Sequence, residues 1–584
     1  MKSSAKSSVI FSGFLAALVM VLFWDLIIYR VHFIFNQIPR GGDILQHVAP
    51  TWRYYFAHQG IELPSDIISD YYLEVILPPL YKFIYWILTF FVTPPESSSI
   101  LALGLNLIII SALSASAYVA TRSALVTAIV AGVILNFMTL SGIWSTGLER
   151  SMGTALLSVA LLCLVAERFS YLFILSLVSV LIYPPAALLI FGTYCIALLM
   201  EKGATIEAFK KVIILGVLFG VAATPQILGG KKYGPRLSGN DAIRFEEVGA
   251  GGRLSSVDRG EIEVNPWKVL KQNVGRYLVK ISLKIDDKPL AQSKNRSPGE
   301  KFKKYKSRLV TWISGLILIS FIVLILKFPK LDREEKRGLK IILVIPAAMM
   351  LCYVAAILLF PWLYIPSRYI SIGASVVMLC IVPILFWSCL GAFRFARMRS
   401  VALFLLFGGL IFLLHGGLPK LPERLNDQKA NSLRYQKRTA LEEAVVSLSP
   451  QALLVGWPAG RINSIPFVTG RNALITEETH QVFHENYLYE MRRRMEGVTE
   501  LMCASSGAKF DTAALKLKND FGASHILIDL RYQRTTPEYF APFGKEVAAC
   551  RTPSPRITDK FLISLGKQRI IYKDKQTALL EIVG

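Results

Sequence analysis

Long apolar runs constrain this chain more than any other feature of its sequence. Residues 9–28, 309–326 and 341–360 each form a run long enough for an α-helix to cross a bilayer core, which takes about 18 to 20 residues. Hydrophobic residues make up 53% of the chain and charged residues 18%, whereas soluble domains carry about a quarter charged residues. The sequence therefore predicts a polytopic α-helical membrane protein and excludes a disordered chain, a collagen-like fibre and a small disulfide scaffold.

Run length predicts eleven membrane spans. The run 75–92 contains Pro78, Pro79 and Lys82, so it is interpreted as a helix that lies in the membrane interface. Two prolines break the run around residue 184, so two short spans are expected to meet there. The spans are expected near 8–29, 98–119, 124–140, 152–166, 169–182, 184–200, 211–228, 309–327, 340–360, 370–390 and 401–417.

The distribution of basic residues predicts the orientation. The net charge of +24 could indicate nucleic-acid binding, but membrane proteins also place Lys and Arg beside their spans, and that reading is preferred. With the N-terminus inside, the short inner segments hold sixteen Lys and Arg residues and the short outer loops hold two. Five basic residues in 301–308 fall outside, at the end of a loop long enough to escape the charge rule. We expect a bacterial inner membrane protein with a cytoplasmic N-terminus.

This topology divides the chain into a membrane domain, residues 1–417 with outer loops 30–97 and 229–308, and an extracytoplasmic domain, residues 418–584. Short apolar runs and amphipathic segments give the second domain an α/β pattern. Thr476 is the expected N-cap of its first helix, and Cys503 and Cys550 are the one pair of cysteines suited to an external disulfide. Strands are expected at 452–457, 525–529, 561–565 and 578–583, and helices at 478–496 and 511–520.

The first outer loop holds the leading catalytic candidate, Asp43. Two glycines precede it and allow a tight turn just beyond the first span. A carboxylate there could act as a general base towards an acceptor, or could hold a divalent cation such as Mg or Mn. The alternative is that Asp43 only caps a helix starting at Ile44. His47 and Arg53 follow in the same loop and are candidates for binding the substrate.

More polar residues are predicted on the same side of the membrane. Glu149 is a second acidic candidate, and Arg150 follows it in a short outer loop. Arg368 and Tyr369 lie at the lip of a later span, where an arginine can bind a membrane-anchored phosphate in bidentate fashion. The alternative is an ordinary arginine that extends to the interface. Together these residues suit a charged, lipid-linked substrate.

The layout resembles the GT-C class of membrane glycosyltransferases, which includes aminoarabinose and protein O-mannosyl transferases. The resemblance rests on Asp43 in the first outer loop, on Pro-Pro-Leu-Tyr at 78–81, on Pro-Ser-Arg-Tyr at 366–369, and on many short spans before an outer C-terminal domain. It implies transfer of a sugar from a polyprenyl-phosphate carrier to a glycan, lipid or protein acceptor outside the cytoplasm, with inversion. It also implies that Asp43 is the base or metal-positioning residue and that Arg368 binds the carrier phosphate. Paired acids are usual in the first loop of that class, but here Ile44 follows Asp43, so neither a metal nor an acceptor is defined.

Other functions stay open from the sequence. A transporter or flippase of a lipid-linked glycan would also place acids and arginines near the membrane, and a non-catalytic assembly factor could use the C-terminal domain to bind an envelope partner.

His480 and His484, four residues apart on a predicted helix, have a spacing that can bind zinc, but a solvated helix face is preferred. The glycines at 249–252 match no nucleotide-binding pattern, and neither nucleic acid nor nucleotide is expected as a ligand.

Overall fold

The computed structural model describes residues 43–140, 146–237, 333–358, 367–376, 438–481, 483–529 and 569–583, with isolated residues between them. The expected spans at 8–29, 309–327 and 401–417, the strand at 561–565 and Cys550 lie outside these residues. Two compact units make up the chain. The helical unit contains Met1–Asn36, Ile100–Ala223 and Asn265–Leu433, and the sheet unit contains Gln37–Ser99, Thr224–Val264 and Arg434–Gly584.

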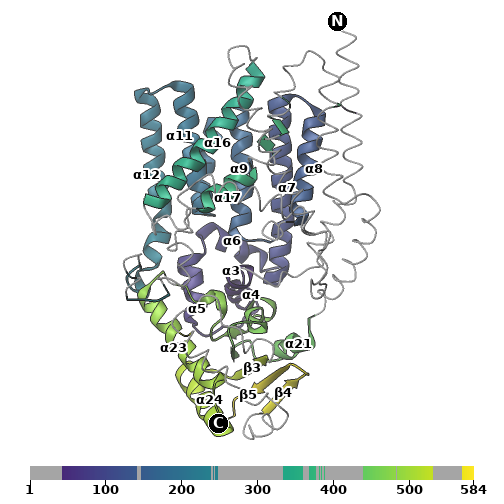
Figure 1. The fold of residues 1–584 in the computed structure, drawn as a ribbon, viewed down its shortest axis with the longest axis vertical. Helices are drawn as coiled ribbons and strands as arrows, with labels where there is room; N and C mark the ends of the chain where they lie inside the picture. Colours follow the sequence, from purple (N-terminus) through teal and green to yellow (C-terminus); the bar gives the residue numbers. More distant parts are fainter. Residues whose placement is uncertain are drawn as a thin grey trace, which may run out of the picture. The chain divides into compact units, whose positions relative to one another are not determined.

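Helices of the helical unit follow the apolar runs closely. The expected span 124–140 is α8, and the two spans predicted on either side of the prolines are separate helices that meet at Tyr183. In Figure 1, α9, α11, α16 and α17 lie side by side, and these four helices contact one another. The helices are α7 (Pro94–Thr121), α8 (Ala124–Leu140), α9 (Glu149–Val165), α10 (Phe169–Val180), α11 (Pro184–Lys202), α12 (Ile206–Gly229), α16 (Arg333–Leu358) and α17 (Ser367–Val376).

Among the described residues, α7 and α11 are long and apolar enough to cross a membrane. Shorter apolar helices accompany them, and α12 exposes Ile213, Val217 and Val221 on successive turns. An apolar stripe of this kind is unfavourable in water but costs nothing against lipid. The helical unit therefore has the surface expected of a membrane protein, while the total of eleven spans stays a prediction.

The C-terminal part of the sheet unit is an α/β fold, as expected. The five strands among its described residues have the order β2-β1-β3-β5-β4, with β1 parallel to β2 and β3, and β5 antiparallel to β3 and β4. The two edge strands, β2 and β4, were not expected, because β2 has only two residues and β4 is largely exposed and carries no run of buried apolar residues. The strands are β1 (Leu453–Gly456), β2 (Asn472–Ala473), β3 (His525–Asp529), β4 (Arg569–Lys573) and β5 (Thr577–Glu581).

Alternating residues of the strands build a hydrophobic core on each face of this sheet. Val455 and Ile526 pack with α23 (Glu485–Met502) and α24 (Gly507–Phe521). Leu454 and Leu527 pack on the opposite face with α21 (Ala440–Val446) and with residues around α22 (Ile465–Thr469). The expected helix 511–520 is thus confirmed as α24, whereas the expected helix 478–496 begins later, at Glu485.

That late start has a local cause. Thr476 is the N-cap of a short 3-10 helix, η10 (Glu477–Thr479), in which the Thr479 hydroxyl accepts a 2.9 Å hydrogen bond from the Thr476 amide. The chain then leaves helical conformation, and His484, in extended conformation, is the N-cap of α23. The prediction that His480 and His484 lie on one solvated helix face was therefore wrong, and both side chains are buried.

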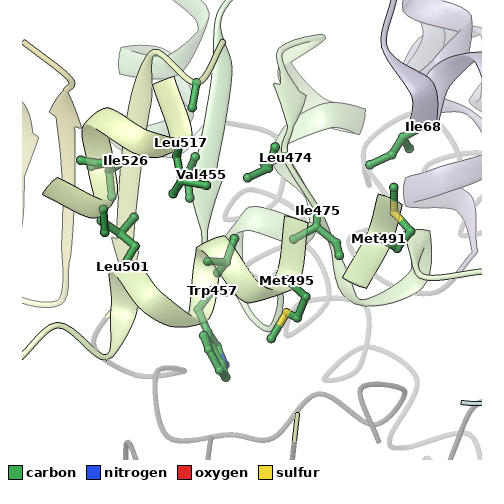
Figure 2. Close-up of a cluster of buried hydrophobic side chains, with 14 of the residues drawn as sticks. Ile68, Val455, Trp457, Leu474, Ile475, Met491, Met495, Leu501, Leu517 and Ile526 are labelled. Carbon is green, nitrogen blue, oxygen red and sulfur yellow. The ribbon is translucent and has the colours of Figure 1, made fainter. Parts of the chain in front are cut away.

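The first outer loop is part of the sheet unit. It forms α3 (Ile44–His47), η1 (Ala49–Thr51), α4 (Trp52–His58), α5 (Ile67–Tyr71), a π-helical turn η2 (Tyr72–Ile76) and α6 (Pro79–Leu88). Ile68 of α5 belongs to the same buried cluster as Met491 of α23, and Figure 2 shows the two side chains together. The Trp52 indole also donates a 2.8 Å hydrogen bond to the Phe467 carbonyl. The compact unit thus extends beyond the 418–584 domain expected from the sequence.

Helix α6 has the features expected of an interfacial helix. Pro78 is its N-cap and Pro79 its first residue, where a missing N–H costs nothing. Its ten residues extend about 15 Å, too short to cross a bilayer. Tyr81 and Tyr85 are buried, whereas Phe83 and Trp86 are exposed on the other side. An aromatic face of this kind suits the headgroup region of a membrane.

Candidate functional site

The predicted site residues fall into two groups, one in each unit. Asp43, His47 and Arg53 belong to the sheet unit, and Glu149, Arg150, Arg368 and Tyr369 belong to the helical unit.

Asp43 immediately precedes α3, and its side chain does not cap that helix. The helix begins at Ile44, as the alternative interpretation required, but the amides of Gln46 and His47 donate to the backbone carbonyl of Asp43, at 3.2 and 2.9 Å. No helix amide donates to its carboxylate. Helix capping therefore does not account for the position of this carboxylate.

His47 lies on the same helical face as Asp43 and is supported from the C-terminal part of the unit. Its ring packs edge-on against Tyr72, with the ring centroids 5.7 Å apart. The Tyr72 hydroxyl in turn accepts a 2.8 Å hydrogen bond from the buried Gln481 side chain. Tyr72 begins the π-helical turn η2, a rare geometry that is frequent at functional sites. Gln481 thus links the C-terminal region to the surroundings of Asp43.

Arg53 is engaged within the first outer loop. It forms an ion pair with Asp70 and donates a 2.9 Å hydrogen bond to the Pro64 carbonyl. These contacts tie α4 to the segment that leads into α5. The assignment of Arg53 to substrate binding stays a prediction, since the guanidinium already has an acidic partner.

In the helical unit, three helices bring their N-terminal residues together. Glu149 and Arg150 are the first residues of α9, Tyr183 is the N-cap of α11, and Arg368 is the second residue of α17. The Tyr183 hydroxyl lies close enough to interact electrostatically with Arg368, Arg150 and Glu149. Glu149 is buried and Arg368 partly buried. Helix N-termini carry a partial positive charge, so this cluster is electropositive despite its one acid.

Tyr183 was not among the predicted site residues. The packing of the helices brings it into the cluster. Its ring lies against Gly153 of α9, where an added Cβ atom would be 2.4 Å from the tyrosine Cδ1 atom. Tyr369 is also buried, next to Arg368 in α17. The sequence signal that could have indicated Tyr183 is its position directly before two prolines that start a helix.

Gly153→Ala is expected to push Tyr183 out of this cluster. The overlap with the ring should cost about 1–3 kcal/mol of unfolding free energy, measured as a lower melting temperature in detergent. Gly104→Ala in α7 is the matched control, because an added methyl group there meets nothing within 4 Å. The control should be neutral or slightly stabilising, and equal effects of both substitutions would contradict the packing described here.

His484 joins three segments of the sheet unit. Its Nδ1 atom lies 2.8 Å from the Tyr71 hydroxyl, and an added Cβ atom at Gly230 would be 2.3 Å from its Nε2 atom. Arg236 pairs with it through a β-bridge. Burial, and then the nearby positive charge of Arg236, lower the pKa of His484 to about 4. This histidine is therefore a neutral connector of the first outer loop, the 229–237 segment and α23.

The stability of the sheet unit should consequently depend on pH. An unfolded histidine, with a pKa near 6.5, takes up its proton before folded His484 does. The unfolded state therefore gains protons as the pH falls from about 6.5 to about 4, and stability falls over the same window. His484→Gln should show a flatter dependence of melting temperature on pH between 7.5 and 4.5. Identical slopes for the wild type and the variant would contradict this role.

A metal site is not assembled by the described residues. No group of three or more His, Cys, Asp or Glu side chains that could hold an ion occurs within them. His480 illustrates this, because its nearest acid, Glu247, is already held by two 2.6 Å hydrogen bonds from Arg492. The metal-positioning role of Asp43 stays a prediction.

Comparison with known proteins gives distant structural likenesses only. No family model and no curated protein sequence matches the chain. It is similar to the oligosaccharyltransferase of Archaeoglobus fulgidus crystallised with Zn and sulfate, with a TM-score of 0.41, 11% identity, and coverage of 95% of this chain and 72% of that chain. It is also similar to ArnT from Cupriavidus metallidurans in the apo state, with a TM-score of 0.37, 12% identity, and coverage of 97% and 98%. Another structure of that ArnT, bound to undecaprenyl phosphate, gives a TM-score of 0.36 at 12% identity, again covering 97% of this chain and 98% of that chain. These TM-scores are too low to support an inference about function.

Proposed function

We propose that this protein is an integral-membrane glycosyltransferase that takes a sugar from a polyprenyl-phosphate carrier and transfers it to an acceptor on the extracytoplasmic face. The observation that carries the proposal is the cluster at the N-terminal ends of α9, α11 and α17. It combines two arginines, a buried tyrosine hydroxyl and three helix N-termini, at the ends of apolar helices.

Each part of that cluster favours a membrane-anchored phosphate. A phosphodiester carries one negative charge, and Arg368 and Arg150 can supply charge-assisted hydrogen bonds to its oxygens. The helix N-termini add positive potential without a counter-ion. Glu149 reduces the net charge of the cluster, and its proposed role is a second acid that orients the arginines or the substrate. Tyr369, buried beside Arg368, is proposed to hold that arginine in position.

The proposed reaction is a direct displacement at the anomeric carbon. The acceptor oxygen or nitrogen forms a bond to that carbon while the bond to the phosphate oxygen breaks, and the lipid phosphate leaves with the electron pair. Asp43 takes the proton from the acceptor, as general bases do. Attack from the side opposite the leaving group inverts the anomeric configuration. His47 is proposed to contact the acceptor or the sugar, since it shares the helical face of Asp43.

An extracytoplasmic position of the sheet unit is supported by its cysteine chemistry. Cys503 at the end of α23 is disulfide-bonded, whereas Cys163, Cys195, Cys352 and Cys380 of the helical unit are free thiols. Disulfides persist in oxidising compartments such as the periplasm. The predicted partner, Cys550, lies outside the described residues.

The test compares envelope glycans and lipid-linked sugars by mass spectrometry in a null strain and in the same strain restored with the wild-type gene. The null strain should lose one sugar from an envelope component and accumulate the corresponding lipid-linked sugar. Purified protein should then transfer that sugar from the lipid to the acceptor in detergent. A strain whose lipid-linked sugar changes sides of the membrane, with no transfer by the purified protein, would instead indicate a transporter. Unchanged lipid-linked sugars with a disturbed envelope would favour an assembly factor.

A further inference from the structure

Gln46 is a buried amide in the helix that follows the proposed base, Asp43. It lies in α3, where its side chain is only 4% exposed. Its Oε1 atom is buried and accepts no hydrogen bond within the described part of the chain. Apolar neighbours in α3, Ile44 and Leu45, are buried as well. The amide is therefore enclosed, with its acceptor oxygen unused.

The helical spacing places this amide with the proposed reacting groups. Residues three and four apart in a helix lie on one face, so Gln46 and His47 both share a face with Asp43. The backbone N–H of Gln46 donates a 3.2 Å hydrogen bond to the backbone carbonyl of Asp43, so the helical turn is continuous from residue 43. One short turn thus presents a carboxylate, an amide and an imidazole together.

An unused buried amide oxygen is unfavourable in a protein without its ligand. Leaving such a group without a hydrogen bond costs free energy, and most buried polar atoms have a partner. A partner supplied by a substrate removes this cost on binding. The required partner is a donor, meaning an O–H or N–H group, and both a sugar and an acceptor carry such groups.

We propose that Gln46 is a specificity-determining residue whose Oε1 atom accepts a hydrogen bond from a hydroxyl or amine group of the substrate on which Asp43 acts. This inference rests on the proposed function, since it takes the surroundings of Asp43 as the reacting centre. The donor group belongs either to the transferred sugar or to the acceptor.

Gln46→Met tests the inference because it keeps the length of the side chain and removes the amide. The Michaelis constant for the substrate that Gln46 binds should rise about 5- to 50-fold, which is the loss of one hydrogen bond that the variant cannot replace. The melting temperature of the ligand-free variant should rise, because the unused buried oxygen is gone. If the Gln46 amide instead stabilised the ligand-free fold, its removal would lower the melting temperature.

The kinetic arms identify the source of the donor group. If only the Michaelis constant for the lipid-linked sugar rises, the donor group belongs to the sugar. If only the Michaelis constant for the acceptor rises, the donor group belongs to the acceptor. Gln59→Met, at an exposed position after α4, is the matched control and should change neither constant. Unchanged constants in Gln46→Met, or a variant that fails to fold, would overturn the inference.

A parallel Asp43→Asn variant separates the two hypotheses. If Asp43→Asn is inactive and Gln46→Met behaves like the wild type, the proposed base is supported and the specificity role fails. If Asp43→Asn is fully active while Gln46→Met raises a Michaelis constant, Gln46 binds the substrate and the proposed base is wrong.

Discussion

Asp43→Asn is expected to lower the turnover number about 100- to 10,000-fold, which is the usual contribution of a positioned general base. Asparagine has nearly the same shape but cannot take the acceptor's proton. Because Asp43 does not cap α3 with its side chain, the substitution should leave the melting temperature almost unchanged. The Michaelis constant for the lipid-linked sugar should also stay near the wild-type value. Transfer by purified protein at saturating acceptor is the measurement.

Glu62→Gln provides the control for charge removal in the same loop. Glu62 is exposed between α4 and α5, so its neutralisation should affect neither turnover nor stability. A fully active Asp43→Asn protein would show that the carboxylate is not the base. Transport or assembly would then become the stronger hypothesis.

Arg368→Gln is expected to raise the Michaelis constant for the lipid carrier about 10- to 100-fold, because hydrogen bonds to charged groups contribute about 1.5–3 kcal/mol. Arg368→Lys should recover part of this loss, since lysine keeps the charge but not the bidentate fork. Binding of a polyprenyl phosphate without a sugar should weaken in parallel, because the contact is made to the phosphate. Titration calorimetry or a fluorescent lipid in detergent would measure this affinity.

The matched control is Arg168→Gln. Arg168 is the N-cap of α10 and is exposed, so its loss removes the same positive charge from the same unit at a place remote from the cluster of Tyr183. Equal weakening by both substitutions would mean that only the overall charge matters. Unchanged phosphate affinity in Arg368→Gln would reject the anion site.

Local patterns in the sequence predict the elements of this fold well. A run of apolar residues between turn signals defines α8, and two consecutive prolines define the start of α11, because proline lacks the amide that a helix interior needs. The short apolar run in 525–529 likewise matches β3, in which all five residues are buried. Asp43 as the residue before a helix was also predictable, since the glycines that precede it allow the turn. These features depend on residues that are neighbours along the chain.

Partners distant in the sequence could be identified only from the tertiary structure. Edge strand β4 is largely exposed and was not predicted, and its strand pairing with β5 appears only in the tertiary structure. Tyr183 reaches the predicted Arg368 only when α9, α11 and α17 pack together. His484 meets the Tyr71 hydroxyl of the first outer loop at 2.8 Å, a contact between residues far apart in the sequence.

By itself, the sequence determined the class of protein, the positions of most helices and the candidate acid and arginines, because apolar periodicity and proline act over a few residues. Tertiary structure decided that the first outer loop packs into the core of the C-terminal sheet, with Ile68 beside Met491. It also decided that the Gln46 amide is enclosed beside Asp43. Burial is a property of the whole packed unit, so no local pattern encodes which polar groups are left without a partner until a substrate supplies one.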